Sequence, residues 1–90
     1  MSDLENVAVV ARSFEQFNHW AEEERAARGG TYRRSSCVLE QSGRRYFYVR
    51  RPSDLWGMRI VDVVAVGDYW RREDAVDIGR EIERAKLRTS

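Results

Sequence analysis

The sequence contains one cysteine, one proline and no apolar run that approaches the length of a membrane span. A single cysteine excludes a disulfide framework and a thiolate cluster for structural zinc. The N-terminal residues lack the basic start and apolar core of a signal peptide, so we expect a cytoplasmic protein with no membrane partner. We also expect no cofactor, because the six glycines fit neither a phosphate loop nor a dinucleotide-binding fingerprint.

Lysine is almost absent as well, since fifteen of the sixteen basic residues are arginine. Fifteen acidic residues bring the net charge to +1, which argues against a general affinity for nucleic acid. The charge is unevenly distributed, however. Residues 28–51 contain seven arginines and one acid, a balance of +6, whereas the rest of the chain carries −5. Because of this basic segment, nucleic acid remains a possible partner.

The length of 90 residues predicts one α/β domain over residues 1–90. Residues 6–11 and 60–66 are nearly unbroken apolar runs, typical of strands covered on both faces. Ser13 with Gln16 predicts the start of a helix. The expected order is β-α-β-β-β-α, with strands at 6–11, 31–40, 45–51 and 60–66 and helices at 13–28 and 73–88. We therefore expect a mixed four-stranded sheet between two helices, with both apolar strands inside the sheet and the central hairpin at one edge.

The hairpin at 31–51 turns tightly at Ser42-Gly43 and gathers arginines around two tyrosines. Strand alternation puts Tyr46, Tyr48 and Arg50 on one face. A two-residue turn adds Arg33 to that face, whereas a three-residue turn adds Arg34. Rings flanked by guanidinium groups can stack bases and hold phosphates, which favours nucleic-acid binding. The candidate residues are Arg33, Arg44, Arg45, Tyr46, Tyr48 and Arg50. The alternative is that the tyrosines pack under the second helix while the arginines only solvate an edge.

Three aromatic residues, Trp56, Tyr69 and Trp70, flank the last strand in loops. Tryptophan and tyrosine often anchor interfaces, so these residues are candidates for contact with a protein. Alternatively, they plug the ends of the sheet.

No set of residues predicts catalysis or a metal site. Cys37 is expected in a strand and His19 in a helix, with no third group to orient them. Asp62 and Asp68 could act as an enzyme's paired carboxylates only if a pocket brought them together. We instead expect Asp62 to lie at the sheet margin or to pair with an arginine.

Several short motifs spread over most of the chain support a resemblance. They are Val9-Val10-Ala11-Arg12, Tyr46 to Val49, Asp54-Leu55-Trp56-Gly57, and Val63-Val64-Ala65-Val66-Gly67 leading to Tyr69-Trp70-Arg71 and Asp74. Together they resemble small uncharacterised proteins encoded by actinobacterial phages. This chain departs from them in its longer basic hairpin and in Glu73, where a proline is often found. The resemblance implies a phage accessory protein that acts on a host or phage protein in the host cytoplasm.

These observations predict a non-enzymatic binding module. We expect it to engage a host or phage protein, or a second copy of itself, through Trp56, Tyr69 and Trp70. The alternative is nucleic-acid binding through the hairpin at residues 31–51.

Overall fold

The computed structural model describes residues 4–87 and contains five strands instead of the four that we expected. The strands are β1 (Glu5–Ala11), β2 (Thr31–Arg33), β3 (Val38–Gln41), β4 (Arg44–Tyr48) and β5 (Asp62–Val66). The helices are α1 (Phe14–Arg28) and α2 (Ala75–Leu87). Three 3₁₀ turns lie in the connections: η1 (Arg34–Ser36) between β2 and β3, η2 (Pro52–Leu55) between β4 and β5, and η3 (Tyr69–Arg71) between β5 and α2. Arg88, the expected end of the last helix, lies outside the described residues. Neither described helix is long and apolar enough to cross a membrane.

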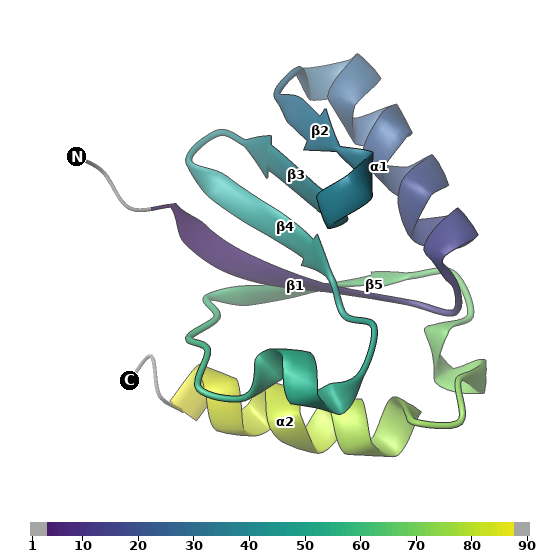
Figure 1. Ribbon diagram of the computed structural model, residues 1–90, viewed down its shortest axis with the longest axis vertical. Helices are drawn as coiled ribbons and strands as arrows, with labels where there is room; N and C mark the ends of the chain where they lie inside the picture. The colour runs from purple at the N-terminus through teal and green to yellow at the C-terminus, as the bar shows by residue number, and fades with distance from the viewer. Residues whose placement is uncertain (1–3, 88–90) are drawn as a thin grey trace.

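The sheet is mixed, as predicted, with the strand order β2-β3-β4-β1-β5 (Figure 1). β1 runs parallel to both β4 and β5, whereas β3 runs antiparallel to β2 and β4. β1 lies inside the sheet, and its last five residues are buried. The prediction of an interior strand at residues 6–11 is therefore confirmed.

The prediction that the second apolar strand also lies inside the sheet is wrong, because β5 is an edge strand. Its side chains nevertheless contact apolar residues on both faces. Val63 packs with the cluster beneath α2, and Val64 and Val66 pack with the cluster beneath α1. An edge strand with cover on both faces has the same apolar sequence as an interior strand, so the sequence could not separate them.

The expected strand at 31–40 is divided by η1, which explains the fifth strand. Cys37 has a φ of 56°, in the left-handed region, and this conformation ends η1 immediately before β3 begins. The two-residue turn at Ser42-Gly43 is confirmed, since Gln41 pairs with Arg44. The hairpin lies at one edge of the sheet, as expected. The short β2 is the outermost strand on that side, and β4 joins the hairpin to β1.

The two helices cover opposite faces of the sheet, as predicted (Figure 1). Phe17 and Ala21 of α1 are buried with Leu39 against one face. Ile78 and Ile82 of α2 are buried against the other. The two clusters do not cover the ends of the parallel strands or all of the sheet face beneath α2. Loops and charged side chains lie there instead.

A side chain and a glycine fix the end of α1 against the hairpin. The buried side chain of Gln41 donates hydrogen bonds through Nε2 to the carbonyl oxygens of Glu24 (3.0 Å) and Gly29 (2.8 Å). Gly30 follows with a φ of 104° and passes so close to the Glu40 carbonyl oxygen that a Cβ would collide with it. Glycine is therefore required at position 30 for two independent reasons.

We expect Gly30→Ala to lower the free energy of unfolding by about 2 kcal/mol or more, because it combines a positive φ with a backbone collision. Gly29→Ala is the matched control. Its φ of 80° and ψ of −162° are also unfavourable for alanine, but no atom beyond its chain neighbours lies within 4 Å of the added Cβ. Only the backbone conformation is therefore penalised, by about 1–2 kcal/mol. Urea unfolding followed by circular dichroism measures both values. Equal losses in the two variants would contradict the close approach at Gly30.

Candidate nucleic-acid interface

Arg72 lies where the parallel strands β1 and β4 end. Its guanidinium donates hydrogen bonds to the carbonyl oxygens of Ala11 (3.2 Å), Val49 (2.6 Å) and Arg50 (2.6 Å). The carboxylate of Asp74 accepts two more, at 2.9 and 3.1 Å. Only 8% of the Arg72 side chain is exposed. This charge therefore sits among fixed partners instead of in water.

The position of Arg72 matters because open α/β sheets bind ligands outside the carboxyl ends of their strands, where neighbouring connections leave toward opposite faces. The connection after β1 enters α1 on one face, whereas those after β4 and β5 enter η2 and α2 on the other (Figure 1). The Arg72 guanidinium lies in this crevice, 5.7 Å from the centroid of the Tyr48 ring. A ligand site beside the crevice is therefore expected.

The seven arginines of residues 28–51 divide into paired and unpaired side chains. Four form ion pairs: Arg28 with Glu24, Arg33 with Glu40, Arg44 with Asp62 and Arg51 with Asp54. Arg34, Arg45 and Arg50 form no salt bridge with any residue in the described range 4–87. The unpaired positive charge of the segment is thus carried by three side chains, and all three line two adjoining hollows.

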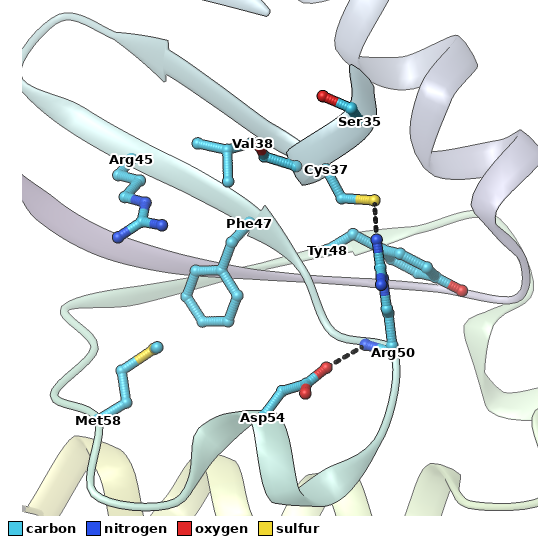
Figure 2. A pocket seen from close by; sticks show the side chains of 10 residues that line it. Ser35, Cys37, Val38, Arg45, Phe47, Tyr48, Arg50, Asp54 and Met58 are labelled. Carbon is cyan, nitrogen blue, oxygen red and sulfur yellow. Dashed lines mark hydrogen bonds between the residues drawn. The ribbon is translucent and has the colours of Figure 1, made fainter. Parts of the chain in front are cut away.

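The first hollow, which we call the polar hollow, has a volume of about 400 Å³ and lies on the α2 face of β3 and β4. Figure 2 shows Arg45 and Arg50 on opposite sides of it, with Phe47 between them. Ser35 and Ser36 add hydroxyl groups. Asp54 also lines it, but its carboxylate already accepts the backbone N–H of Arg50 at 2.9 Å. The lining therefore presents more free donors than acceptors.

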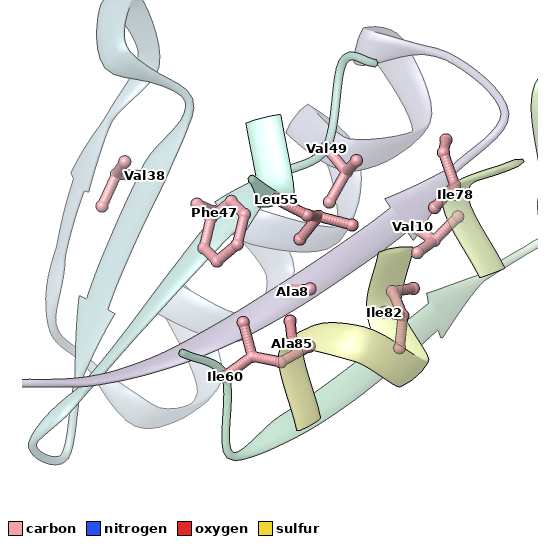
Figure 3. Packing of buried hydrophobic residues seen from close by; sticks show 10 residues of the cluster. All are labelled: Ala8, Val10, Val38, Phe47, Val49, Leu55, Ile60, Ile78, Ile82 and Ala85. Carbon is pink, nitrogen blue, oxygen red and sulfur yellow. The ribbon is translucent and has the colours of Figure 1, made fainter. Parts of the chain in front are cut away.

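The polar hollow exists because α2 covers only part of this sheet face. Figure 3 shows Ile78, Ile82 and Ala85 of α2 gathered over β1, whereas Val38 of β3 lies well apart from the helix. Phe47 of β4 lies between these two regions. The uncovered end of the sheet forms the floor of the hollow.

The second hollow, the aromatic hollow, has a volume of about 380 Å³ and lies on the α1 face. It is lined by Phe14, Arg34, Cys37, Tyr48 and Arg50. The guanidinium of Arg34 lies 5.9 Å from the Phe14 ring centroid. Arg50 stands between the hollows and donates a hydrogen bond to the Cys37 sulfur at 3.0 Å. The two hollows share Cys37, Tyr48 and Arg50, so together they form one arginine groove around the Arg50 side chain.

The structure brings three of the six hairpin candidates together in the groove: Arg45, Tyr48 and Arg50. It places the other three elsewhere. Arg33 and Arg44 are held in their ion pairs, and Tyr46 packs edge-on against Trp20, with ring centroids 5.7 Å apart.

The two hairpin tyrosines pack beneath α1, not beneath the second helix as the packing alternative proposed. Tyr48 stacks on Phe17 with ring centroids 5.2 Å apart, and burial raises the pKa of the Tyr48 hydroxyl above its ordinary value. The faces of this ring are occupied by Phe17 and the Arg72 guanidinium. Tyr48 therefore lines the groove, but neither face of its ring is free to stack on a ligand.

The loop aromatics divide into two sites. Tyr69 is partly buried against the α2 cluster. The Trp70 ring packs edge-on against the Tyr69 ring, with centroids 5.5 Å apart. Trp56 follows η2, which ends toward the C-terminal end of α2, whereas η3 lies at the start of that helix (Figure 1). Within residues 4–87 no ring contact joins Trp56 to the other two. Both tryptophans are mainly exposed.

The residues considered for catalysis lie apart from one another. His19 Nε2 contacts Glu23 at 2.8 Å on the outside of α1, while the Cys37 sulfur contacts Arg50. Asp62 starts β5 and pairs with Arg44, as expected, whereas Asp68 follows the end of that strand. Among the described residues no group of three or more His, Cys, Asp or Glu side chains could hold a metal ion.

Sequence reasoning missed Arg72, Phe14 and the serines of η1 as parts of this region. Arg72 lies in a charged loop and has no sequence signal of burial. Arg34 was considered only with a three-residue turn, yet it reaches the groove because η1 turns the chain there. Arg34 differs from the neighbouring arginines in that they form ion pairs and it does not within residues 4–87. Those ion pairs depend on the folded structure, so the sequence does not reveal them.

No protein-family model, curated protein or solved structure matches the chain.

Proposed function

We propose that this chain is a non-enzymatic binding module that engages a protein partner through Trp70. The supporting observation is that the Trp70 side chain is mainly exposed, at 63%, while its ring rests on Tyr69. Tyr69 in turn packs against the α2 cluster. An indole held in this way loses little conformational freedom on binding, and tryptophan is among the commonest interface anchors.

A charged network stiffens the turn that carries Trp70. The Asp68 carboxylate accepts hydrogen bonds from Gln16 (2.9 Å) and Arg12 (3.2 Å), and Arg71 lies 3.5 Å from it. The Gln16 hydrogen bond holds the pKa of Asp68 below its ordinary value. The Asp68 carboxylate thus ties the turn to the start of α1.

Trp56 supplies a second anchor, with 69% of its side chain exposed. Because it lies toward the other end of α2, one partner can contact both tryptophans only by following the helix. The resemblance to actinobacteriophage proteins favours a host or phage protein in the bacterial cytoplasm as the partner. A second copy of this chain is the other partner that the proposal allows.

Photo-crosslinking tests the proposal. A benzoylphenylalanine at the exposed position 73, three residues after an intact Trp70, in purified protein mixed with actinobacterial lysate, is expected to give one discrete adduct identified by mass spectrometry. Excess unlabelled wild-type chain should compete it away, whereas Trp70→Ala should not. Purified chain alone tests self-association. The control carries the crosslinker at Glu22, an exposed position of α1 on the opposite face of the sheet. The same adduct from position 22, or equal competition by Trp70→Ala, would contradict the proposal.

Nucleic-acid binding is the second candidate function. It is favoured by one specific observation, the convergence of Arg34, Arg45 and Arg50 on the arginine groove.

A further inference from the structure

We propose that the arginine groove binds a single strand of nucleic acid. One base occupies the aromatic hollow, beside Phe14, and the adjoining phosphates lie against Arg50 and Arg45. This inference rests on the second candidate function and gives it a defined site. It is independent of the protein contact through Trp70.

The distribution of charge supports an anionic ligand. Within residues 4–87, Arg34, Arg45 and Arg50 form no ion pair, while four arginines of the same segment are neutralised by ion pairs. The Asp54 carboxylate also lines the polar hollow, but it accepts the backbone N–H groups of Arg50 and Arg51. Arg45 and Arg50 face one another across the polar hollow (Figure 2). Guanidinium groups on two sides of a hollow can each contact a phosphate, and Arg forms paired hydrogen bonds with phosphate oxygens.

The two hollows differ in the chemistry of their walls. The aromatic hollow is bounded by the Phe14 and Tyr48 rings and the Cys37 sulfur, with Arg34 over Phe14. Bases stack on aromatic rings and on guanidinium planes, so this wall suits a base. The polar hollow contains Ser35 and the paired arginines, which suit a sugar and its phosphates.

The arrangement favours a single strand over a duplex. The aromatic hollow and the polar hollow open on opposite faces of the sheet, and Arg50 is the ridge between them. A chain that passes from one to the other must bend around Arg50 and insert an unstacked base. A flexible single strand can do this, whereas the bases of a duplex are held in their stack.

Fluorescence anisotropy with labelled oligo(dT) and oligo(U) at low salt tests the proposal. The variants Arg34→Gln, Arg45→Gln and Arg50→Gln are each expected to weaken binding about fivefold. For Arg45→Gln and Arg50→Gln the slope of log affinity against log salt should fall by about 0.7, the value for one lost phosphate contact with a single strand. Phe14→Leu should weaken binding about fivefold while leaving the salt slope unchanged.

Arg33→Gln and Arg44→Gln are the matched controls, because they remove the same charge from the same hairpin but from arginines that are already paired. They should weaken binding less than twofold. If all five glutamine variants weaken binding equally, the groove is not the site, although nucleic-acid binding as such survives. If no oligonucleotide binds at low salt, both the groove proposal and the second candidate function are wrong.

Two further ligands complete the test. A nucleoside monophosphate and a labelled DNA duplex should each bind at least tenfold more weakly than the single strand. A monophosphate that binds as tightly as the oligonucleotide would overturn the proposal in favour of a small phosphorylated ligand. A duplex that binds as tightly would overturn it by showing that no base enters the aromatic hollow.

Discussion

Replacement of Arg72 by leucine is expected to lower the free energy of unfolding by about 3 kcal/mol. The wild-type guanidinium donates to the carbonyl oxygens of Ala11, Val49 and Arg50 and to the Asp74 carboxylate. Leucine fills similar space but donates nothing. It leaves these acceptors at the strand ends without the donor that now holds them, and removal of one member of a largely buried ion pair is strongly destabilising.

Two further variants locate the origin of this loss. Arg72→Lys keeps the charge, but one ammonium group cannot reach both Asp74 and the strand ends, so we expect about half of the loss. Arg71→Leu is the control, since 65% of the Arg71 side chain is exposed and its ion pair with Asp68 is at the surface. We expect a change within about 0.5 kcal/mol there. Urea unfolding that gives similar values for Arg72→Leu and Arg71→Leu would contradict the role assigned to Arg72.

Phe17→Ala is expected to lower the free energy of unfolding by about 4 kcal/mol. Phe17 is fully buried, and its ring contacts those of Phe14, Trp20, Tyr32 and Tyr48 at centroid distances of 5.2 to 6.3 Å. Alanine leaves a cavity beneath α1 and removes the central member of this group. The loss is a large fraction of the total stability of a small domain, so part of the population should be unfolded at 37 °C.

The control for this prediction is Phe17→Leu, which keeps an apolar side chain and should lose about 1.5 kcal/mol. A second readout is available because Trp20 contacts Phe17, with ring centroids 6.0 Å apart. Native-state fluorescence should change in Phe17→Ala. A loss under 1 kcal/mol in that variant would show that α1 does not depend on this aromatic group.

The local signals in the sequence predicted much of this fold correctly. The apolar, β-branched run at 6–11 gives an interior strand, and Ser13 begins α1 by accepting a hydrogen bond from the Gln16 backbone at 3.4 Å. The Ser42-Gly43 turn sets the hairpin register, with Leu39 opposite Tyr46 as expected. Each of these features is decided within a few residues, which is why the sequence alone sufficed.

The predictions that were wrong or incomplete concern features that depend on contacts between residues far apart in the sequence. β5 was placed inside the sheet because cover on both faces gives it an interior composition, although no strand of residues 4–87 lies beside its outer edge. The strand at 31–40 was predicted unbroken, because nothing in the sequence marks Cys37 for a left-handed conformation. In the candidate site, Arg45, Tyr48 and Arg50 were predicted, whereas Arg72 was not, since its burial depends on the ends of two separate strands, β1 and β4.

The Arg72 guanidinium lies in the crevice at the strand ends, and we propose that binding takes place on the surface beside it. Arginine side-chain NMR tests this most directly. The Arg72 Nε–H should exchange slowly with water and show cross-peaks to the Tyr48 ring, whereas the Nε–H of the exposed Arg71 should exchange rapidly. An Arg72 Nε–H that exchanges as fast as that of Arg71, without contact to Tyr48, would show that the crevice is open and would contradict the account.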